Sequence, residues 1–234
     1  SKLAFFTGRD QSQSFTSWFA QAYGTPNYAA HGGFCSVNMA AAGIYTMGGA
    51  FWEFGQPDWD RTKLFMLFGV AEDHDSNPIK MGLGKLKKRG AKVIGVNPIR
   101  SGYNAIADEW VGITPGTDGL FIMALMHELI RAGKVALGYL ARYTNAGFII
   151  DEDPNSPDKG LFIRGESGKP QVVARETGKL VDYDMPGTTP NLAAQMVEGD
   201  VTHRTVFQLI AERYMGDEYA PEAVAERTGV PADK

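Results

Sequence analysis

The chain has 234 residues, of which 44% are hydrophobic and 21% are charged, and its formal net charge at pH 7 is -4. These values are typical of a globular domain. The net negative charge argues against a nucleic-acid-binding surface, and the one basic run, residues 85–89, is typical of the solvated end of a helix. A single cysteine excludes an internal disulfide, a four-cysteine zinc site and an iron-sulfur cluster held by this chain alone.

The first elements alternate between extended and helical patterns. The chain opens on Ser1 and leads directly into an apolar run at residues 3–7, so we expect a piece of a longer protein whose first strand lies there. No apolar stretch reaches the roughly 18 residues that cross a bilayer, and the first residues lack the apolar centre of a signal peptide. Residues 10–23 have helical spacing of aromatic side chains, and residues 28–31 are expected to be extended.

The only cysteine, Cys35, lies in a turn that also contains His31, two glycines and Ser36. Lone cysteines are most often small buried hydrophobes, so the spacing alone leaves open whether Cys35 packs or reacts. Residues 39–45 predict a helix of small side chains. The aromatic, glycine-rich residues 48–59 predict either a lid over a pocket or a packed surface turn.

The next stretch predicts a βαβ unit. Residues 64–68 are apolar and bounded by charge and glycine, residues 79–88 are helical up to a stop at Gly90, and residues 91–96 form the next strand. Strand, loop, helix and strand within about thirty residues imply a parallel sheet with crossover connections.

A further strand at residues 110–113 and a helix at residues 119–131 follow, and Thr117 or Asp118 can cap that helix. We therefore predict an α/β fold with an open, mainly parallel, dinucleotide-binding-like sheet and helices on both faces. In such sheets, ligands bind beyond the carboxyl ends of the strands.

The last third has a different pattern. Its expected elements are a helix at 139–144, a strand at 148–150, a polar loop at 151–158, short antiparallel strands at 171–175 and 179–183, and helices at 206–214 and 221–228. We divide the chain into an α/β region, residues 1–145, and a small α+β excursion of the same subunit, residues 146–234.

The loop after the strand at 64–68 concentrates polar groups. It contains Glu72, Asp73, His74, Asp75 and Asn77. Carboxylate and imidazole groups suit a metal or an acid-base pair, but the spacing fits no established metal pattern. We favour a loop that binds the phosphates or ribose of a ligand.

Other candidates stand at the ends of predicted strands. Arg100 leaves a strand at the edge where phosphates bind, and its planar guanidinium suits them. Asp118 caps its own helix or accepts hydrogen bonds from a guanine. His127 is expected in the core and His203 on the surface. No G-x-G-x-x-G follows a strand, which weakens an ordinary NAD-dehydrogenase interpretation.

Several segments together resemble the molybdopterin oxidoreductases of the dimethyl sulfoxide reductase family. Within it, the likeness is greatest to catalytic subunits of the polysulfide-, thiosulfate- and sulfite-converting group. The segments match in order and spacing across residues 3–132. They are Thr7-Gly8-Arg9-Asp10, His31-Gly32-Gly33-Phe34-Cys35, Phe65-Met66-Leu67-Phe68-Gly69, residues 90–100, Ile106-Ala107-Asp108 and Pro115-Gly116-Thr117-Asp118.

The resemblance implies a bis(molybdopterin guanine dinucleotide) cofactor carrying molybdenum or tungsten. Cys35 stands where the family places its protein ligand to the metal, with Ser36 as the alternative, and His31 is a candidate proton donor in the substrate pocket. A soft thiolate suits a metal bound by dithiolenes.

The resemblance also assigns the nucleotide end of the cofactor. The loop from Gly69 to Asn77, which includes Glu72, Asp73 and His74, is expected to hold phosphates and ribose. Asn97 and Arg100 would contact the nucleotide, and Asp118 would bind guanine. The family commonly has aspartate where this chain has Asn97.

The function that the resemblance implies is two-electron or oxygen-atom transfer on a small, sulfur-containing substrate. The fragment would be inactive alone, because it would cover about a quarter to a third of a catalytic subunit. A 4Fe-4S cluster is expected only in a preceding part of the full protein. Expected partners are a membrane anchor subunit plus an iron-sulfur electron-transfer subunit, without nucleic acid and without direct membrane insertion.

We expect a prokaryotic protein at the cytoplasmic or periplasmic face of the inner membrane, with the cytoplasmic face favoured. Two alternatives remain: a metal-free scaffold with the same fold, and a simple nucleotide-binding domain.

Overall fold

The computed structural model of the chain describes residues 2–8, 13–31, 36–47, 57–69 and 79–234. It forms two compact units, residues 1–57 and 58–234, and each is described by itself. The functional division at residue 145 stays a prediction. Within the described ranges, no helix combines the length and apolar character needed to span a membrane.

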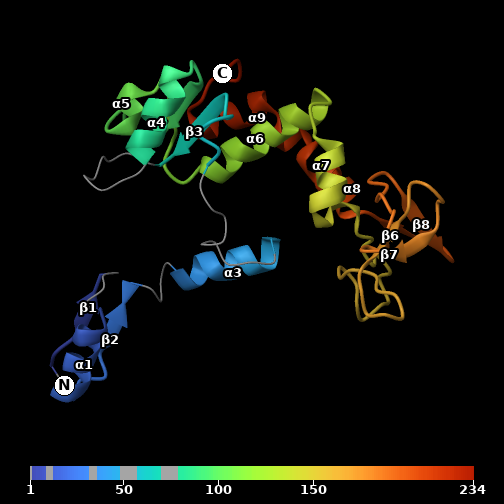
Figure 1. The fold of residues 1–234 in the computed structure, drawn as a ribbon, viewed down its shortest axis with the longest axis horizontal. Helices are drawn as coiled ribbons and strands as arrows, with labels where there is room; N and C mark the ends of the chain where they lie inside the picture. The colour runs from blue at the N-terminus through green and yellow to red at the C-terminus, as the bar shows by residue number, and fades with distance from the viewer. Residues whose placement is uncertain (1, 9–12, 32–35, 48–56, 70–78) are drawn as a thin grey trace. The chain divides into compact units, whose positions relative to one another are not determined.

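The first unit contains a small parallel pair of strands with a helix beside it (Figure 1). Its elements are β1 (Phe5–Thr7), α1 (Gln13–Tyr23), β2 (Tyr28–Ala30) and α3 (Ser36–Met47). β1 pairs with β2 in parallel, and the Phe5 ring lies 5.7 Å from Phe19 of α1 and 6.4 Å from Tyr28, between ring centroids. The predicted strand-helix-strand order is therefore confirmed for the described residues.

The second unit is built on a three-stranded parallel sheet in the order β3-β4-β5. Its first elements are β3 (Leu64–Phe68), α4 (Ile79–Lys88), β4 (Lys92–Val96), α5 (Tyr103–Ile106) and β5 (Glu109–Val111). All five residues of β3 pair in register with β4, from Leu64 opposite Lys92 to Phe68 opposite Val96. The predicted βαβ unit is confirmed, and the chain is a mixed α/β protein.

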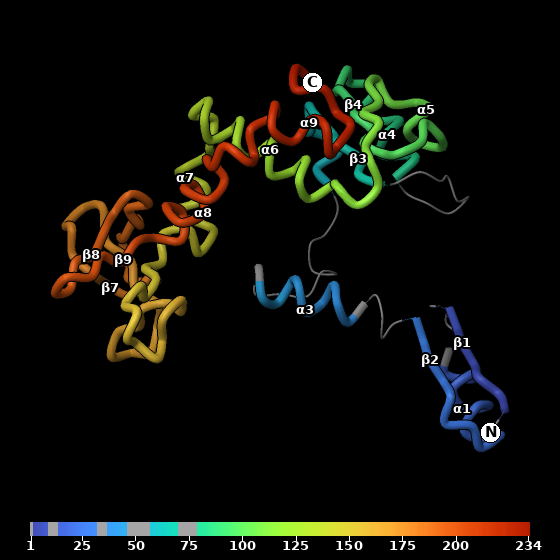
Figure 2. Tube along the Cα trace, turned by 180° about the vertical axis from the view of Figure 1, so that it is seen from behind, coloured from blue at the N-terminus to red at the C-terminus, as the bar shows by residue number. Residues whose placement is uncertain are grey.

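Side chains alternate between the two faces of this sheet, because successive residues of a strand point in opposite directions. Leu67 and Val93 pack with α4 and α5 in one buried cluster. Met66, Ile94 and Val96 pack in a second cluster with α6 (Asp118–Arg131). Figure 2 shows the strands between α4 and α5 on one side and α6 and α9 (Pro221–Thr228) on the other.

The end of the described chain closes the second cluster. The Thr114 N–H, just after β5, donates to the carbonyl of Thr228 at 2.8 Å. Val230 is 6% exposed and belongs to the same buried cluster as Val96 and Val111. The buried cluster on this face of the sheet is therefore completed by residues more than a hundred positions away in sequence.

Between α6 and α9 the chain makes a long detour. It contains α7 (Leu137–Tyr143), η2 (Asn145–Gly147), β6 (Gln171–Val173), β7 (Leu180–Asp182), β8 (Gln195–Glu198), β9 (Val201–Arg204), α8 (Val206–Tyr214) and η3 (Asp217–Tyr219). We call residues 148–205 the β segment. β6 pairs antiparallel with β7, as predicted, and β8 pairs antiparallel with β9, a hairpin that the sequence analysis missed.

The strand predicted at residues 148–150 is replaced by isolated bridges. Phe148 pairs with Val172, Ile149 with Thr205 and Ile150 with Phe162. Each residue bonds to a different part of the β segment, so no continuous ladder forms, although the backbone is extended there.

We expect Leu86→Ala to destabilise the chain by about 2–5 kcal/mol, because it opens a cavity in the first cluster. Leu86 is fully buried on α4, whereas Met81 on the same helix is 74% exposed. Met81→Ala is the matched control and should cost at most about 0.5 kcal/mol. Urea unfolding measures both, and equal losses for the two variants would contradict the described packing.

Candidate functional site

The carboxyl edge of the three-stranded sheet is the candidate site. Strand pairing continues to the last residue of each strand: the Gly69 N–H donates to the Val96 carbonyl at 3.0 Å, and the Asn97 N–H donates to the Val111 carbonyl at 3.1 Å. Gly69 has a φ of +67°, a left-handed conformation that turns the chain out of the sheet. The segments that follow β3, β4 and β5 therefore leave the sheet at one edge.

Asn97 begins a tightly held turn after β4. It is 6% exposed, and its side-chain Nδ2 donates to the Ile99 carbonyl at 2.9 Å. The indole Nε1 of Trp110 in β5 donates to the Asn97 carbonyl at 2.9 Å. The amide group of Asn97 thus shapes its own turn, a role the sequence analysis did not assign.

Arg100 follows this turn and is exposed. In the described part of the chain, no ion pair with a carboxylate occupies its guanidinium. An exposed guanidinium at the carboxyl edge of a parallel sheet can form bidentate hydrogen bonds with a phosphate.

Asp118 is the first residue of α6, the helix that follows β5. Thr117, one of the two predicted capping residues, is the N-cap residue, but the expected side-chain cap bond is not formed, because its hydroxyl donates to the Thr114 carbonyl at 2.7 Å. A carboxylate in the first turn still interacts favourably with the helix dipole. Because α6 follows β5, Asp118 lies on the segment that leaves the sheet at the same carboxyl edge.

Other predicted site residues are not placed by the structure. Cys35, Glu72, Asp73, His74 and Asn77 lie outside the described residues. His31 follows β2 in the first unit and is exposed, and Ser36 begins α3. Among the described residues, no group of three or more histidine, cysteine, aspartate or glutamate side chains could hold a metal ion.

His127 and His203, the described histidines of the second unit, are both buried. His127 is 6% exposed with its Nδ1 at 2.8 Å from the Tyr214 carbonyl, which confirms the predicted core position. The surface position predicted for His203 is wrong: it is 3% exposed, and its Nδ1 accepts a hydrogen bond from the Glu152 N–H at 3.0 Å. The alternation of Val201 and His203 along one face of β9, continued by Thr205 just after the strand, was the signal that could have revealed this.

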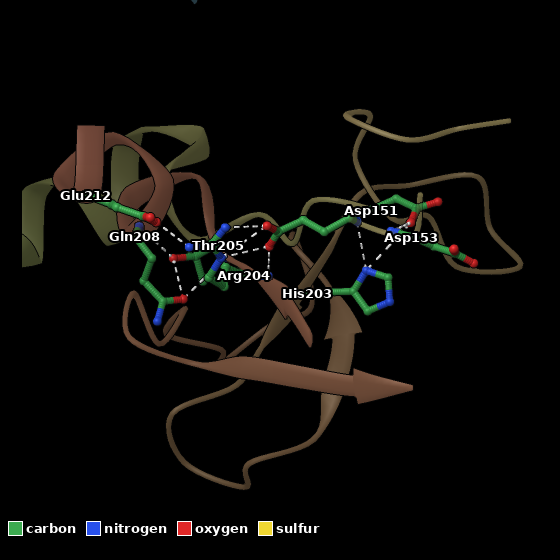
Figure 3. Close-up of polar contacts among 8 residues, drawn as sticks. Asp151, Asp153, His203, Arg204, Thr205, Gln208 and Glu212 are labelled. Atoms are coloured by element: carbon green, nitrogen blue, oxygen red, sulfur yellow. Dashed lines mark hydrogen bonds and ion pairs between the residues drawn. The ribbon is translucent and has the colours of Figure 1, made fainter. Parts of the chain in front are cut away.

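A polar network anchors the β segment to α8 (Figure 3). The Arg204 Nε donates to both carboxylate oxygens of Glu152, at 3.0 and 3.1 Å, and the Arg204 N–H donates to Oε1 at 2.8 Å. Arg204 also pairs with Glu212 of α8. Thr205 and Gln208 form a capping box that starts α8. These residues fix the end of the β segment rather than forming a reactive site.

Hydrogen bonds around this network lower the pKa values of two carboxyl groups, Glu152 and Asp151. Hydrogen bonding to the Arg204 guanidinium lowers the pKa of the Glu152 carboxyl, and the Ser156 hydroxyl lowers the pKa of Asp151.

A cavity of about 500 Å³ opens beside this network, lined among others by Asp151, His203 and Glu198. It lies in the β segment, and no residue that the sequence analysis assigned to the cofactor lines it.

Comparison with known proteins identifies relatives that match between 61% and 99% of the chain. A sequence model described as molybdopterin oxidoreductase matches residues 4–216. A sulfite dehydrogenase subunit of Allochromatium vinosum is 50% identical over 99% of the chain and 25% of that protein. The alpha subunit of perchlorate reductase from Dechloromonas aromatica is 25% identical over 75% of the chain and 23% of that protein.

The molybdopterin-containing subunit of thiosulfate reductase from Salmonella typhimurium is 28% identical over 61% of the chain and 18% of that protein. The chain thus spans a quarter or less of the length of these curated relatives. Among solved structures, acetylene hydratase from Pelobacter acetylenicus matches 98% of the chain and 23% of that protein, with a TM-score of 0.51 and 17% identity. This last similarity supports the fold alone.

We expect Glu152→Gln to destabilise the chain by about 1.5–3 kcal/mol at neutral pH, because it weakens a charge-assisted contact to Arg204. Glu212→Gln is the matched control, since Glu212 contacts the same guanidinium but its side chain is 67% exposed, so it should cost at most about 1 kcal/mol. Urea unfolding of both variants measures the difference. Equal costs for the two would mean that burial of the Glu152 contact adds nothing.

The same contact makes stability depend on pH. Because the folded-state pKa of Glu152 lies below its ordinary value of 4.5, its contribution is complete above that value and is lost as pH falls through the lowered pKa. We expect Glu152→Gln to reduce the loss of stability on acidification. Unfolding midpoints measured from pH 7 down to pH 3 check this, and parallel curves for the variant and the unchanged chain would contradict it.

Proposed function

Because the chain belongs to the molybdopterin oxidoreductase family, we propose that it is the central cofactor-binding part of a catalytic subunit that uses bis(molybdopterin guanine dinucleotide). The observation that carries this proposal is the carboxyl edge of the sheet, where the segments that follow three parallel strands leave together. Parallel α/β sheets bind nucleotides at this edge.

The donor set at this edge fits the nucleotide end of the cofactor. The exposed guanidinium of Arg100 supplies two parallel donors for a phosphate, and the turn held by Asn97 fixes the backbone from which Arg100 extends. The Asp118 carboxylate can accept hydrogen bonds from the N1 and N2 groups of guanine. The loop of residues 69–77, including Glu72, Asp73, His74 and Asn77, would surround phosphate and ribose.

We assign the metal end of the cofactor to the segment that contains Cys35. Cys35 would provide a thiolate to molybdenum or tungsten, with Ser36 as the alternative ligand. When bound, the metal centre supplies two-electron redox chemistry. His31, exposed directly after β2, is the candidate to hold and deliver a proton at the substrate.

The proposed substrate is a small sulfur oxyanion. The relative that is 50% identical over 99% of the chain is named as part of a sulfite dehydrogenase, and a further relative is named as part of a thiosulfate reductase. Both names describe subunits, which supports a full-length protein that works in a complex. The same proposal includes two partner subunits, an iron-sulfur electron-transfer subunit and a membrane anchor. It also includes a 4Fe-4S cluster in a preceding segment and a location at the inner membrane.

We expect Cys35→Ala in the full-length subunit to abolish catalysis and to alter the Mo(V) resonance, because the metal loses its thiolate ligand. Ser36→Ala is the control and should leave both unchanged. Electron paramagnetic resonance and molybdenum analysis measure the outcome. If Cys35→Ala keeps an unchanged resonance while Ser36→Ala alters it, Ser36 is the ligand. If neither variant changes it, both ligand assignments fail.

We expect Arg100→Ala to lower the guanine nucleotide bound per full-length subunit by about tenfold or more, since a charged hydrogen bond to phosphate contributes about 1.5–3 kcal/mol. Arg89→Ala is the control, because Arg89 donates to the Trp59 carbonyl at the opposite edge of the sheet. Guanine released by acid hydrolysis and quantified by chromatography measures occupancy. Unchanged occupancy in Arg100→Ala would remove Arg100 from the site.

A further inference from the structure

The indole of Trp110 connects β5 to the turn that carries Arg100. Its Nε1–H donates to the Asn97 carbonyl at 2.9 Å, and the Asn97 N–H donates to the carbonyl of Val111 in the same strand at 3.1 Å. Both main-chain groups of Asn97 are therefore held by β5. The third bond, from Asn97 Nδ2 to the Ile99 carbonyl at 2.9 Å, closes the turn itself.

Gly112 explains why the indole lies in this position. A Cβ atom built on Gly112 would lie 2.9 Å from Cη2 and 3.0 Å from Cζ2 of the Trp110 ring. Gly112 directly follows β5, and positions two apart in extended backbone lie on the same side of the chain, so the ring of Trp110 lies across the backbone of Gly112. Any side chain at position 112 would displace the ring and move its N–H away from Asn97.

This arrangement fixes the base of the turn before any ligand arrives. Pro98, Ile99 and Arg100 are exposed, so little packing holds them in place. Ordering an exposed segment costs conformational entropy, and a turn that is already ordered loses less of it on binding. The hydrogen bond from Trp110 can therefore raise ligand affinity even though the indole N–H donates to the Asn97 carbonyl and not to the ligand.

We propose that Trp110 is a positioning residue for the nucleotide end of the cofactor, acting through the Asn97 carbonyl on the turn that carries Arg100, and that Gly112 admits its indole. This inference rests on the proposed function. Trp110 itself need not touch the nucleotide.

The test uses the full-length subunit in its complex and compares Trp110→Phe with Trp59→Phe. Trp110→Phe keeps an aromatic ring but removes the N–H donor. Trp59 packs against Phe65 at a centroid distance of 5.2 Å and precedes β3 at the opposite edge, so Trp59→Phe is a matched loss of an indole. The readouts are the molar ratio of guanine nucleotide to protein after prolonged washing and the unfolding midpoint of cofactor-free protein.

We expect Trp110→Phe to retain about two- to tenfold less guanine nucleotide, the range of a single hydrogen bond, with a cofactor-free midpoint equal to that of Trp59→Phe. Gly112→Ala should give the same loss by displacing the ring. Retention equal to that of Trp59→Phe would overturn the inference. So would a loss of retention accompanied by an equally large fall in the cofactor-free midpoint, because that describes packing alone.

A double-mutant cycle separates positioning from general damage. If Trp110 acts through the turn of Arg100, the Trp110→Phe change should cost little retention once Arg100→Ala is present. Fully additive losses would overturn the inference while leaving the proposed function intact. If Arg100→Ala also retains full guanine nucleotide, the proposed nucleotide edge fails, and the inference about Trp110 fails with it.

Discussion

The parallel hydrogen bonding of β3, β4 and β5 is the constraint on which the second unit depends. The hydrogen bonds continue to the ends of the strands: the N–H groups of Gly69 and Asn97, the first residues after β3 and β4, still donate to carbonyls of the neighbouring strands. Backbone geometry therefore gathers the following segments at one edge before any side chain contributes. The helices then pack on the two faces of the sheet, where alternating side chains of the strands form two separate buried clusters.

Much of this part of the fold could be predicted from sequence, because its signals are local. The apolar run of β3, the helical spacing of α4 and the stop at Gly90 each lie within a few residues of the structure they specify. The position of Arg100 at the carboxyl edge followed from the strand before it. The assignments of Cys35 and of residues 72–77 rest on family resemblance, and they remain proposals.

Long-range contacts account for what could not be predicted. The alternation along β9 can indicate that His203 is buried, but not which group meets it: the N–H of Glu152, some fifty residues earlier, donates to its ring. The hydrogen bond of Trp110 depends on a carbonyl thirteen positions away and on the absence of a side chain at Gly112. No periodicity within either segment encodes such pairings, since they exist only after the strands have met.

The return of the chain to the sheet also bears on how this architecture diversifies. α6 leaves the sheet, and the route from its end through the β segment comes back to α9, Thr228 and Val230 beside β5. Contacts of α6 with η3 and α9, together with the bond between His127 and Tyr214, hold the departing and returning ends together. The intervening polypeptide is thus a closed loop on a fixed base, and insertions or deletions within it leave the register at the sheet edge untouched. Evolution can rebuild that loop for new assemblies while the carboxyl edge of the sheet stays the same.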